Sequence, residues 1–299
     1  MQKIKLDVFK SWFDKELTKK EIDFLIVLSF YQNERGVVYG VHYDEMMREV
    51  DMSVQTFYNC KKSLVEKGVI SSEGIWGDYD ITINGNDFTC YTQEDYNEGR
   101  VKYLRMNARL FRDVNFKGLK AKQKLLVMDI YHIQNAGAPR MVQAYRIRRD
   151  NFIKKYANGQ NPDGTFRRGL LNITERTLQK YLKMLQLYFY VGIKEGMYYF
   201  TLRKHFSGKA AEENKVAMEH LLQAACRRNK IKNSDSKEWE DTIYILLNNR
   251  KDITNKFIDI GMIIREMIAV INAAVVNPKK WKRRLKASLF AKLLYEAIA

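Results

Sequence analysis

A segment of nineteen residues occurs twice in this chain, at a constant offset of 121 positions. Residues 52–70 match residues 173–191 in the order of their hydroxyl, apolar and β-branched positions. In each copy a hydroxyl residue, Ser53 or Thr174, stands at a helix N-cap position, and apolar residues follow three to four positions apart. Each copy therefore predicts the second helix of a helix-turn-helix that runs into a β-wing.

The residues around the first copy supply the other elements of the same motif. Thr18 and Glu21 form a capping box, which predicts a helix that runs to about Asn33. Apolar spacing and turn residues predict a strand at 37–41, helices at 42–50 and 54–67, and wing strands at 69–72 and 75–83. We therefore expect an acidic first winged-helix domain over residues 1–99.

The second copy has similar surroundings and an insertion. We expect helices at 119–134, 144–156 and 174–187, a flexible loop at 158–169, and wing strands at 189–194 and 197–203. This gives a basic second winged-helix domain over residues 100–207. Residues 208–299 have helical periodicity and no wing, with helices expected at 209–229, 237–249, 253–276 and 278–299. The expected fold class is mainly α with small β wings: two tandem winged helix-turn-helix domains plus a helical C-terminal domain.

Charge is distributed unevenly along the chain. All 299 residues together carry 52 Lys and Arg against 35 Asp and Glu, a net charge of +17. Residues 1–99 hold 11 basic and 18 acidic residues (−7), residues 100–203 hold 22 and 6 (+16), and residues 204–299 hold 19 and 11 (+8). The middle part would attract a phosphate backbone and the first part would repel it. Double-stranded DNA is therefore the expected partner, with an anionic membrane surface as the competing polyanion.

The second helix-turn-helix is the strongest candidate for DNA contact. Its expected outward face consists of Thr174, Glu175, Arg176, Gln179, Lys180 and Lys183. Arg176 can read guanine, Gln179 adenine and Glu175 cytosine, while the two lysines suit phosphates. Further basic residues of the same domain are Arg146, Arg148, Arg149, Lys154, Lys155, Arg167 and Arg168. The alternative is a solvated helix face that binds nothing.

The first helix-turn-helix offers Gln55 and Lys62 to a groove, but its expected wing is acidic. Glu73, Asp78 and Asp80 stand where phosphate contacts would be expected. We therefore expect a protein–protein role for this domain, such as self-association into a homo-oligomer. The aromatic residues Trp76 and Tyr79 are candidate interface anchors or wing-packing residues.

A basic run near the end of the sequence is a second candidate for phosphate contact. It surrounds Trp281 and consists of Lys279, Lys280, Lys282, Arg283, Arg284 and Lys286. A solvated helix face and a basic helix on a membrane surface are the alternatives.

Catalytic and metal-binding patterns are not found in the sequence. The four histidines are isolated, and no CxxC or HExxH motif is present. Gly159 and Gly164 have the spacing of a phosphate loop, but Thr165-Phe166 follow instead of Lys-Ser/Thr. We therefore expect no enzyme activity, no metal and no cofactor. Three scattered cysteines, no signal peptide and no apolar segment of spanning length predict a cytoplasmic protein.

A basic winged helix preceded by a less basic one resembles the architecture of iteron-binding plasmid replication initiators, over about residues 18–203. The resemblance implies that the first winged helix mainly supports dimerisation and that the second mainly reads repeated DNA. The segment Tyr103-Leu-Arg-Met-Asn-Ala-Arg-Leu-Phe, followed by Leu119-Lys-Ala-Lys-Gln-Lys-Leu-Leu-Val, is also similar to the lead-in of DnaD-type primosome proteins and replication-initiator N-terminal domains. The helical C-terminal domain departs from the minimal initiator.

Together these patterns predict a non-catalytic, sequence-specific binder of double-stranded DNA in plasmid or mobile-element DNA replication or maintenance. A transcription regulator or a partition protein would use the same contacts and stays open. Replication or transcription proteins are expected as further partners. A protein of another class, a winged-helix scaffold for protein interactions, would show no DNA binding at all.

Overall fold

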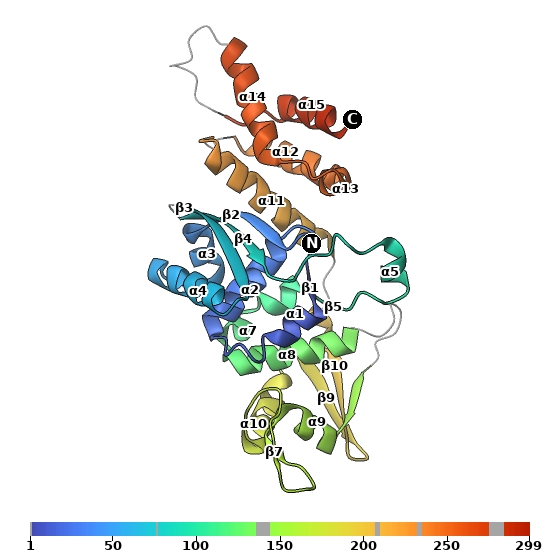
Figure 1. Ribbon diagram of the computed structural model, residues 1–299. Helices are drawn as coiled ribbons and strands as arrows, with labels where there is room; N and C mark the ends of the chain where they lie inside the picture. The colour runs from blue at the N-terminus through green and yellow to red at the C-terminus, as the bar shows by residue number, and fades with distance from the viewer. Residues whose placement is uncertain (1, 76, 136–143, 207–209, 232–234, 275–283) are drawn as a thin grey trace.

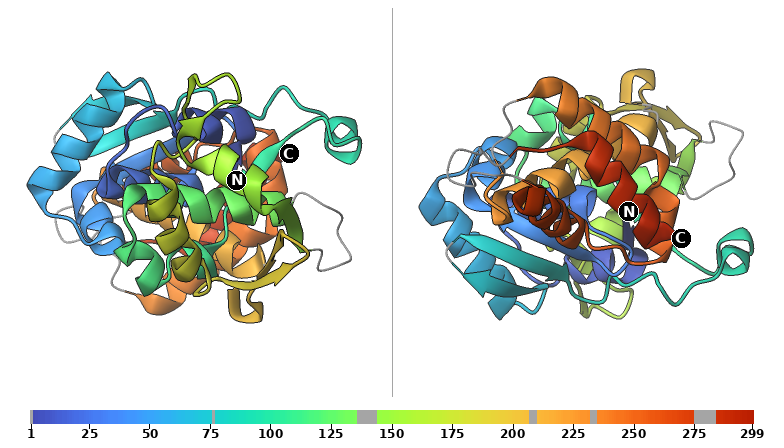
Figure 2. Two further views of the ribbon diagram at one scale, coloured as in Figure 1. Left: turned by 90° about the horizontal axis from the view of Figure 1, so that it is seen from below. Right: turned by 90° about the horizontal axis from the view of Figure 1, so that it is seen from above.

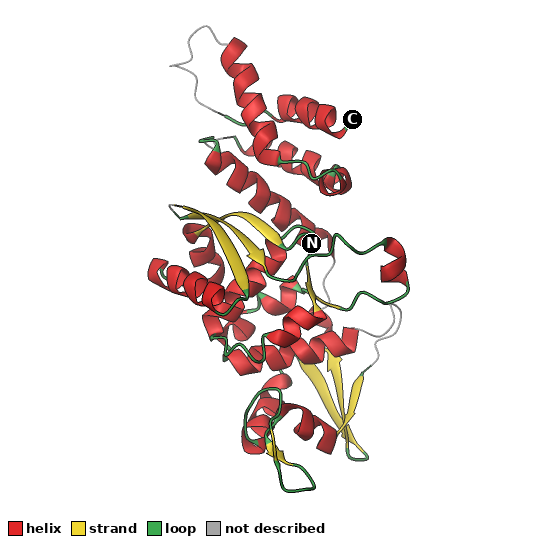
Figure 3. Ribbon diagram, in the orientation of Figure 1, coloured by secondary structure: helices red, strands yellow, loops and turns green. Residues whose placement is uncertain are grey.

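The computed structural model describes residues 2–75, 77–135, 144–206, 210–231, 235–274 and 284–299 (Figure 1). Helices dominate, and the strands form small antiparallel sheets of two or three members (Figure 3). The predicted fold class is confirmed at this level: the chain is mainly α with small β-sheets.

The first repeat copy lies in a group of elements that we call the first module, residues 19–83. Its elements are α2 (Lys19–Tyr31), β2 (Val37–His42), α3 (Tyr43–Val50), α4 (Val54–Glu66), β3 (Ile70–Ile75) and β4 (Asp78–Ile83). The strands form a sheet in the order β2-β4-β3. The capping box predicted at the start of α2 is present, because Thr18 and Glu21 bind each other's backbone N–H groups.

The second repeat copy lies in a module of the same order, residues 121–202. Its elements are α8 (Ala121–Asn135), β6 (Tyr145–Arg148), α9 (Arg149–Tyr156), β7 (Gly159–Gln160), β8 (Phe166–Arg167), α10 (Glu175–Leu185), β9 (Phe189–Lys194) and β10 (Met197–Leu202). The sheet order, β6-β10-β9, repeats that of the first module. The turn before the repeated helix is also shared, because Asp51 and Asn172 both have a left-handed backbone with φ of 51° and 47°.

Two expectations for the second module were wrong. The segment 144–156 is not one helix, because Tyr145–Arg148 forms strand β6 before α9 begins. Tyr145 and Ile147 are half-buried while Arg146 and Arg148 are exposed, which is the alternation of a strand that is covered on one face. The insertion 158–169 is not an irregular loop, because β7 and β8 pair within it as a small antiparallel hairpin.

The two modules share one core. Buried apolar side chains form a single cluster that extends from Ile4 to Phe206. Strand β1 (Lys3–Lys5) pairs with β5 (Tyr103–Arg105), and α2 packs against α8. Inside this interface the ammonium of Lys124 pairs with the carboxylate of Asp23, and both side chains are buried. Four short helices complete this part of the chain: α1 (Leu6–Ser11), α5 (Gln93–Asn97), α6 (Ala108–Phe111) and α7 (Val114–Gly118).

The remaining helices form a second core at one end of the molecule (Figures 1 and 2). After the short 3-10 helix η1 (Lys204–Phe206) come α11 (Ala210–Arg228), α12 (Ser236–Asn248), α13 (Arg250–Asn255), α14 (Ile260–Ala274) and α15 (Ala287–Ile298). The single helix predicted at 253–276 is wrong, because Phe257 has a left-handed backbone (φ 54°) that separates α13 from α14. Helix α11 packs against α2 and β2 and so connects this core to the first module.

Candidate nucleic-acid interface

Helix α10 presents one buried and one exposed side. Its N-cap residue Thr174 accepts a hydrogen bond from the backbone N–H of Thr177 at 3.3 Å. Leu178, Tyr181 and Leu185 are buried and hold the helix on its module. The six residues predicted to face outward are all exposed: Thr174, Glu175, Arg176, Gln179, Lys180 and Lys183. The helix therefore has a polar face available to a partner.

Basic residues also lie at the turned end of the β9–β10 hairpin. The backbone N–H of Arg149 donates to the carbonyl of Gly196 in that turn, at 3.0 Å. Arg148, the last residue of β6, pairs with Met197 of β10 and has an exposed side chain. Lys194 is exposed in the same turn, 3.6 Å from the carboxylate of Glu195. The end of this hairpin is therefore predominantly cationic.

Most of the predicted basic residues are exposed and lack an acidic neighbour. Among the residues that the structure describes, no carboxylate lies within 4.0 Å of the charged nitrogens of the following side chains, which we call the cationic face: Arg146, Arg148, Arg149, Lys154, Arg176, Lys180 and Lys183. Arg168 also has a half-exposed side chain, and its nearest carboxylate is that of Asp14 at 3.9 Å. Exposed cations without a neighbouring carboxylate attract polyanions.

Two of the predicted contacts have a role within the fold. Lys155 Nζ lies 2.6 Å from Asp129 Oδ2, which also accepts a hydrogen bond from the hydroxyl of Tyr156 at 2.6 Å. Arg167 Nη1 donates to the carbonyl of Gln160 at 3.1 Å and holds the β7–β8 hairpin together. We therefore leave Lys155 and Arg167 out of the cationic face.

The basic run near the end of the sequence is not brought to α10. Arg284 is exposed and lies shortly before α15, a helix at the opposite end of the molecule from α10 (Figure 1). Lys286 of the same run lies 2.9 Å from the carboxylate of Glu238. The remaining members lie outside the described residues: Lys279, Lys280, Lys282 and Arg283.

The equivalent helix of the first module has the same packing but different chemistry. Ser53 caps α4 as Thr174 caps α10, and Phe57, Cys60 and Leu64 are buried at the positions of Leu178, Tyr181 and Leu185. On the outward face, α4 carries Gln55, Tyr58 and Asn59 where α10 carries Arg176, Gln179 and Lys180. The one shared cation, Lys62 in place of Lys183, lies 3.8 Å from Glu66.

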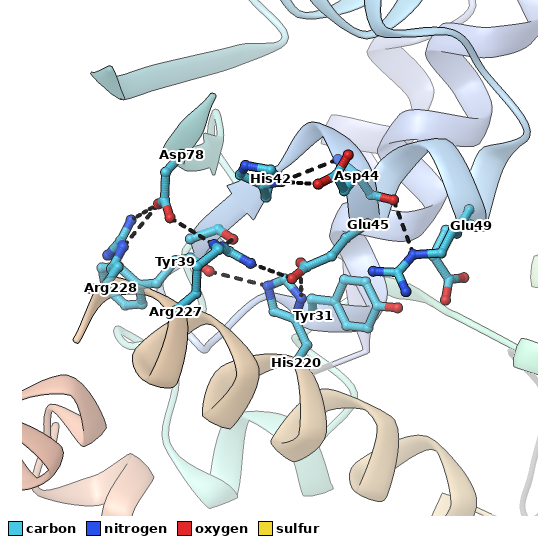
Figure 4. Close-up of polar contacts among 12 residues, drawn as sticks. Tyr31, Tyr39, His42, Asp44, Glu45, Glu49, Asp78, His220, Arg227 and Arg228 are labelled. Carbon is cyan, nitrogen blue, oxygen red and sulfur yellow. Dashed lines mark hydrogen bonds and ion pairs between the residues drawn. The ribbon is translucent and has the colours of Figure 1, made fainter. Parts of the chain in front are cut away.

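Three acidic residues of the first module bind helix α11 of the same chain (Figure 4). Asp78 Oδ1 accepts from Arg228 Nε at 2.9 Å, Asp78 Oδ2 accepts from Arg227 Nε at 3.1 Å, and Asp80 Oδ1 accepts from Arg228 at 2.6 Å. Arg227 also binds the carboxylate of Glu45 and the carbonyl of Gly40. We call Glu45, Asp78 and Asp80 the acidic cluster.

His220 completes this contact from the preceding turns of α11. Its Nδ1 lies 3.2 Å from Glu45 Oε2, its Nε2 lies 3.2 Å from the carbonyl of Tyr39, and its ring stacks on Tyr31 at 4.3 Å. Burial raises the pKa of the Glu45 carboxyl, but His220 and Arg227 outweigh it and hold that pKa below its ordinary value. The sequence patterns did not predict this contact, although positions 220, 227 and 228 share one helix face.

Tyr79, predicted as an interface anchor or a wing-packing residue, packs within the first module. Its ring lies against Phe57, with centroids 6.2 Å apart, and beneath the ammonium of Lys61 at 4.1 Å. Trp76, the other aromatic of that prediction, lies outside the described residues.

Comparisons of the chain with protein families, with curated proteins and with solved structures found no match. Within the described part of the chain, no three His, Cys, Asp or Glu side chains are grouped so that they could hold a metal ion. None of the described helices combines the length and apolar character that a bilayer-spanning segment requires.

Proposed function

We propose that this chain is a non-catalytic, sequence-specific binder of double-stranded DNA built on two tandem winged helices. In this proposal α3 and α4 form the helix-turn-helix of the first module and α9 and α10 that of the second. The β3–β4 and β9–β10 hairpins are the wings. The shared sheet order and the shared left-handed turn before each repeated helix support this assignment.

One observation supports the proposal above the others. The cationic face of the second module is exposed and unpaired among the described residues, whereas the acidic cluster of the first module is bound by α11. The carboxylates of the acidic cluster are thus bound within the chain, whereas the cations of the second module are open toward solvent. A face of this kind suits a phosphate backbone.

In this proposal, helix α10 and the region around the wing of the second module both contact the DNA. Helix α10 would enter the major groove, where Arg176 and Gln179 would read base edges. Lys180 and Lys183 would bind flanking phosphates, as would Arg146, Arg148, Arg149 and Lys154 around the wing. The first module would keep the second in place and offer its remaining surface to a second copy or to replication proteins.

Within this class, we propose replication initiation or maintenance of a plasmid or other mobile element. Tandem modules of unequal charge favour it, because one module can bind DNA while the other contacts protein. Transcription regulation and partition would use the same DNA contacts. The layout of the DNA site distinguishes them, since direct repeats suit an initiator and an inverted repeat suits a dimeric repressor.

Selection of random duplex DNA by the full-length protein, with salt titrated, tests the proposal. We expect a recovered motif whose binding weakens steeply as salt rises, because each phosphate contact releases counterions. Salt-sensitive binding without a motif would contradict sequence-specific reading. No binding at low salt would reject DNA as the partner and favour the scaffold alternative.

A further inference from the structure

The β7–β8 hairpin is held in a defined shape by its own hydrogen bonds. The backbone N–H of Asn161 donates to the carbonyl of Thr165 at 2.8 Å. Asp163, the only carboxylate in the hairpin sequence, accepts from the N–H and the hydroxyl of Thr165 at 3.0 and 2.6 Å. At its base, the N–H of Asn158 donates to the carbonyl of Ile173, just before α10, at 2.7 Å. The hairpin is therefore fixed relative to the start of α10.

This ordered hairpin leaves a large aromatic side chain in water. Phe166, in β8, is 70% exposed, although the chain buries most of its other phenylalanines. Its neighbour Arg168 has a side chain that is 52% exposed. The hairpin lies at the same end of the molecule as α10 (Figure 1). An exposed aromatic ring and an exposed guanidinium two positions apart in the sequence can bind a base and a phosphate respectively.

We propose that the hairpin is a second DNA-contacting element, in which Phe166 stacks against a base at a kinked or opened step beside the site that α10 reads. Apolar side chains inserted between base steps unstack them and bend the duplex. Arg168 binds the phosphate next to that step. The inference rests on the proposed DNA binding, and it adds local opening of the duplex to it.

The test uses the full-length protein and duplexes that carry the selected motif. In one set, 2-aminopurine replaces single bases at successive flanking positions, because its fluorescence rises when it unstacks. In a second set, a two-base mismatch opens the duplex at those positions. We expect the wild type to raise the fluorescence at one flank and to bind the duplex opened there about tenfold more tightly than the intact one.

Phe166→Ala should lose the fluorescence rise and the preference for opened duplex while still discriminating the motif from random DNA. Tyr244→Ala is the matched control, because Tyr244 is an aromatic of 67% exposure on α12, at the opposite end of the molecule, and it should behave as wild type.

The outcomes separate this inference from the proposed function. If the wild type binds no motif, the proposed function fails and the inference fails with it. If the wild type binds its motif without a fluorescence rise, or Phe166→Ala keeps the rise, DNA binding stands and the hairpin inference is overturned. A change in the sedimentation of Phe166→Ala with unchanged fluorescence would assign Phe166 to a contact between copies, and would also overturn it.

Discussion

Glu45 of α3 and His220 of α11 are 175 positions apart in the sequence, and their Oε2 and Nδ1 atoms lie 3.2 Å apart. Arg227 binds the same carboxylate from about two turns further along the same face of α11. The acidic cluster is thus an internal binding surface for helix α11 of the same chain. An acidic wing in the sequence does not require a partner from outside.

Removal of Arg227 should weaken this contact more than removal of Arg228. Arg227→Ala leaves Glu45 without one cation and Gly40 without a donor, and Arg227 is the less exposed of the two, at 27% against 38%. Partial exposure reduces the cost of a broken buried pair, so we expect a loss of about 2 kcal/mol for Arg227→Ala and about 1 kcal/mol or less for Arg228→Ala. Urea denaturation of both variants measures this, and equal losses would contradict it.

Acid should weaken the same contact. Burial raises the pKa of Asp78, but Arg228 and Arg227 outweigh it and lower that pKa, as His220 and Arg227 do for Glu45. A carboxyl with a lowered pKa in the fold contributes stability that is complete above its unfolded pKa and is lost as pH falls through its folded pKa. The free energy of unfolding should therefore fall between about pH 5 and about pH 2, and less steeply in Arg227→Ala. Parallel curves for wild type and variant would exclude this contribution.

The buried pair between α2 and α8 should respond very differently to single and double substitution. Asp23→Leu leaves the Lys124 ammonium buried without its partner, which should cost about 3–5 kcal/mol. Adding Lys124→Met should recover most of that loss, because two apolar side chains need no pairing. Urea denaturation of the single and double variants measures both losses of stability, and a double variant no more stable than Asp23→Leu would contradict this prediction.

Burial lowers the pKa of Lys124 to about 8. Above that pH the unfolded chain binds more protons at this residue than the folded chain does, so the free energy of unfolding should rise with pH.

Substitution of the two helix caps should cost the same stability but have different effects on DNA binding. Ser53→Ala and Thr174→Ala each remove a hydroxyl that accepts from a backbone N–H, at 3.2 and 3.3 Å, so each should cost about 1 kcal/mol of stability. Under the proposed function, only Thr174→Ala should also weaken binding to the selected duplex. Weaker binding by Ser53→Ala to the same extent would place α4 in the groove as well.

Arg176 and Gln55 occupy matched positions of α10 and α4, and both are exposed. Arg176→Ala should weaken binding to the selected DNA by about 1–3 kcal/mol and relax the preference at one base pair. Gln55→Ala is the control and should change neither. The comparison is made in the full-length chain, because the buried core continues from one module into the other and a fragment would expose it. Unchanged discrimination by Arg176→Ala would remove α10 from base reading.

Local signals in the sequence predicted much of each module. The caps at Thr18, Ser53 and Thr174 and the buried stripes of α4 and α10 were found because cap residues and helical spacing are local properties. Strand β6 was missed because four residues with two arginines give too short a pattern to separate a strand from a helix.

Contacts between distant segments could not be predicted in this way. Nothing near Asp78 in the sequence indicates that Arg227 and Arg228 bind it, and nothing near Lys155 indicates that Asp129 pairs with it. Both depend on how the elements pack. The outward face of α10 was predictable because helical geometry alone decides which side chains oppose the buried stripe.

The pairing of β1 with β5 has a consequence for the order of folding during synthesis. Lys3 pairs with Arg105, so strand β1 is synthesised before the first module and has its partner β5 only after that whole module has followed. That edge of the core stays open throughout this interval, and Ile4 is buried only when Leu104 arrives beside it. A pause in translation between the two modules would therefore prolong the exposure of an unpaired strand.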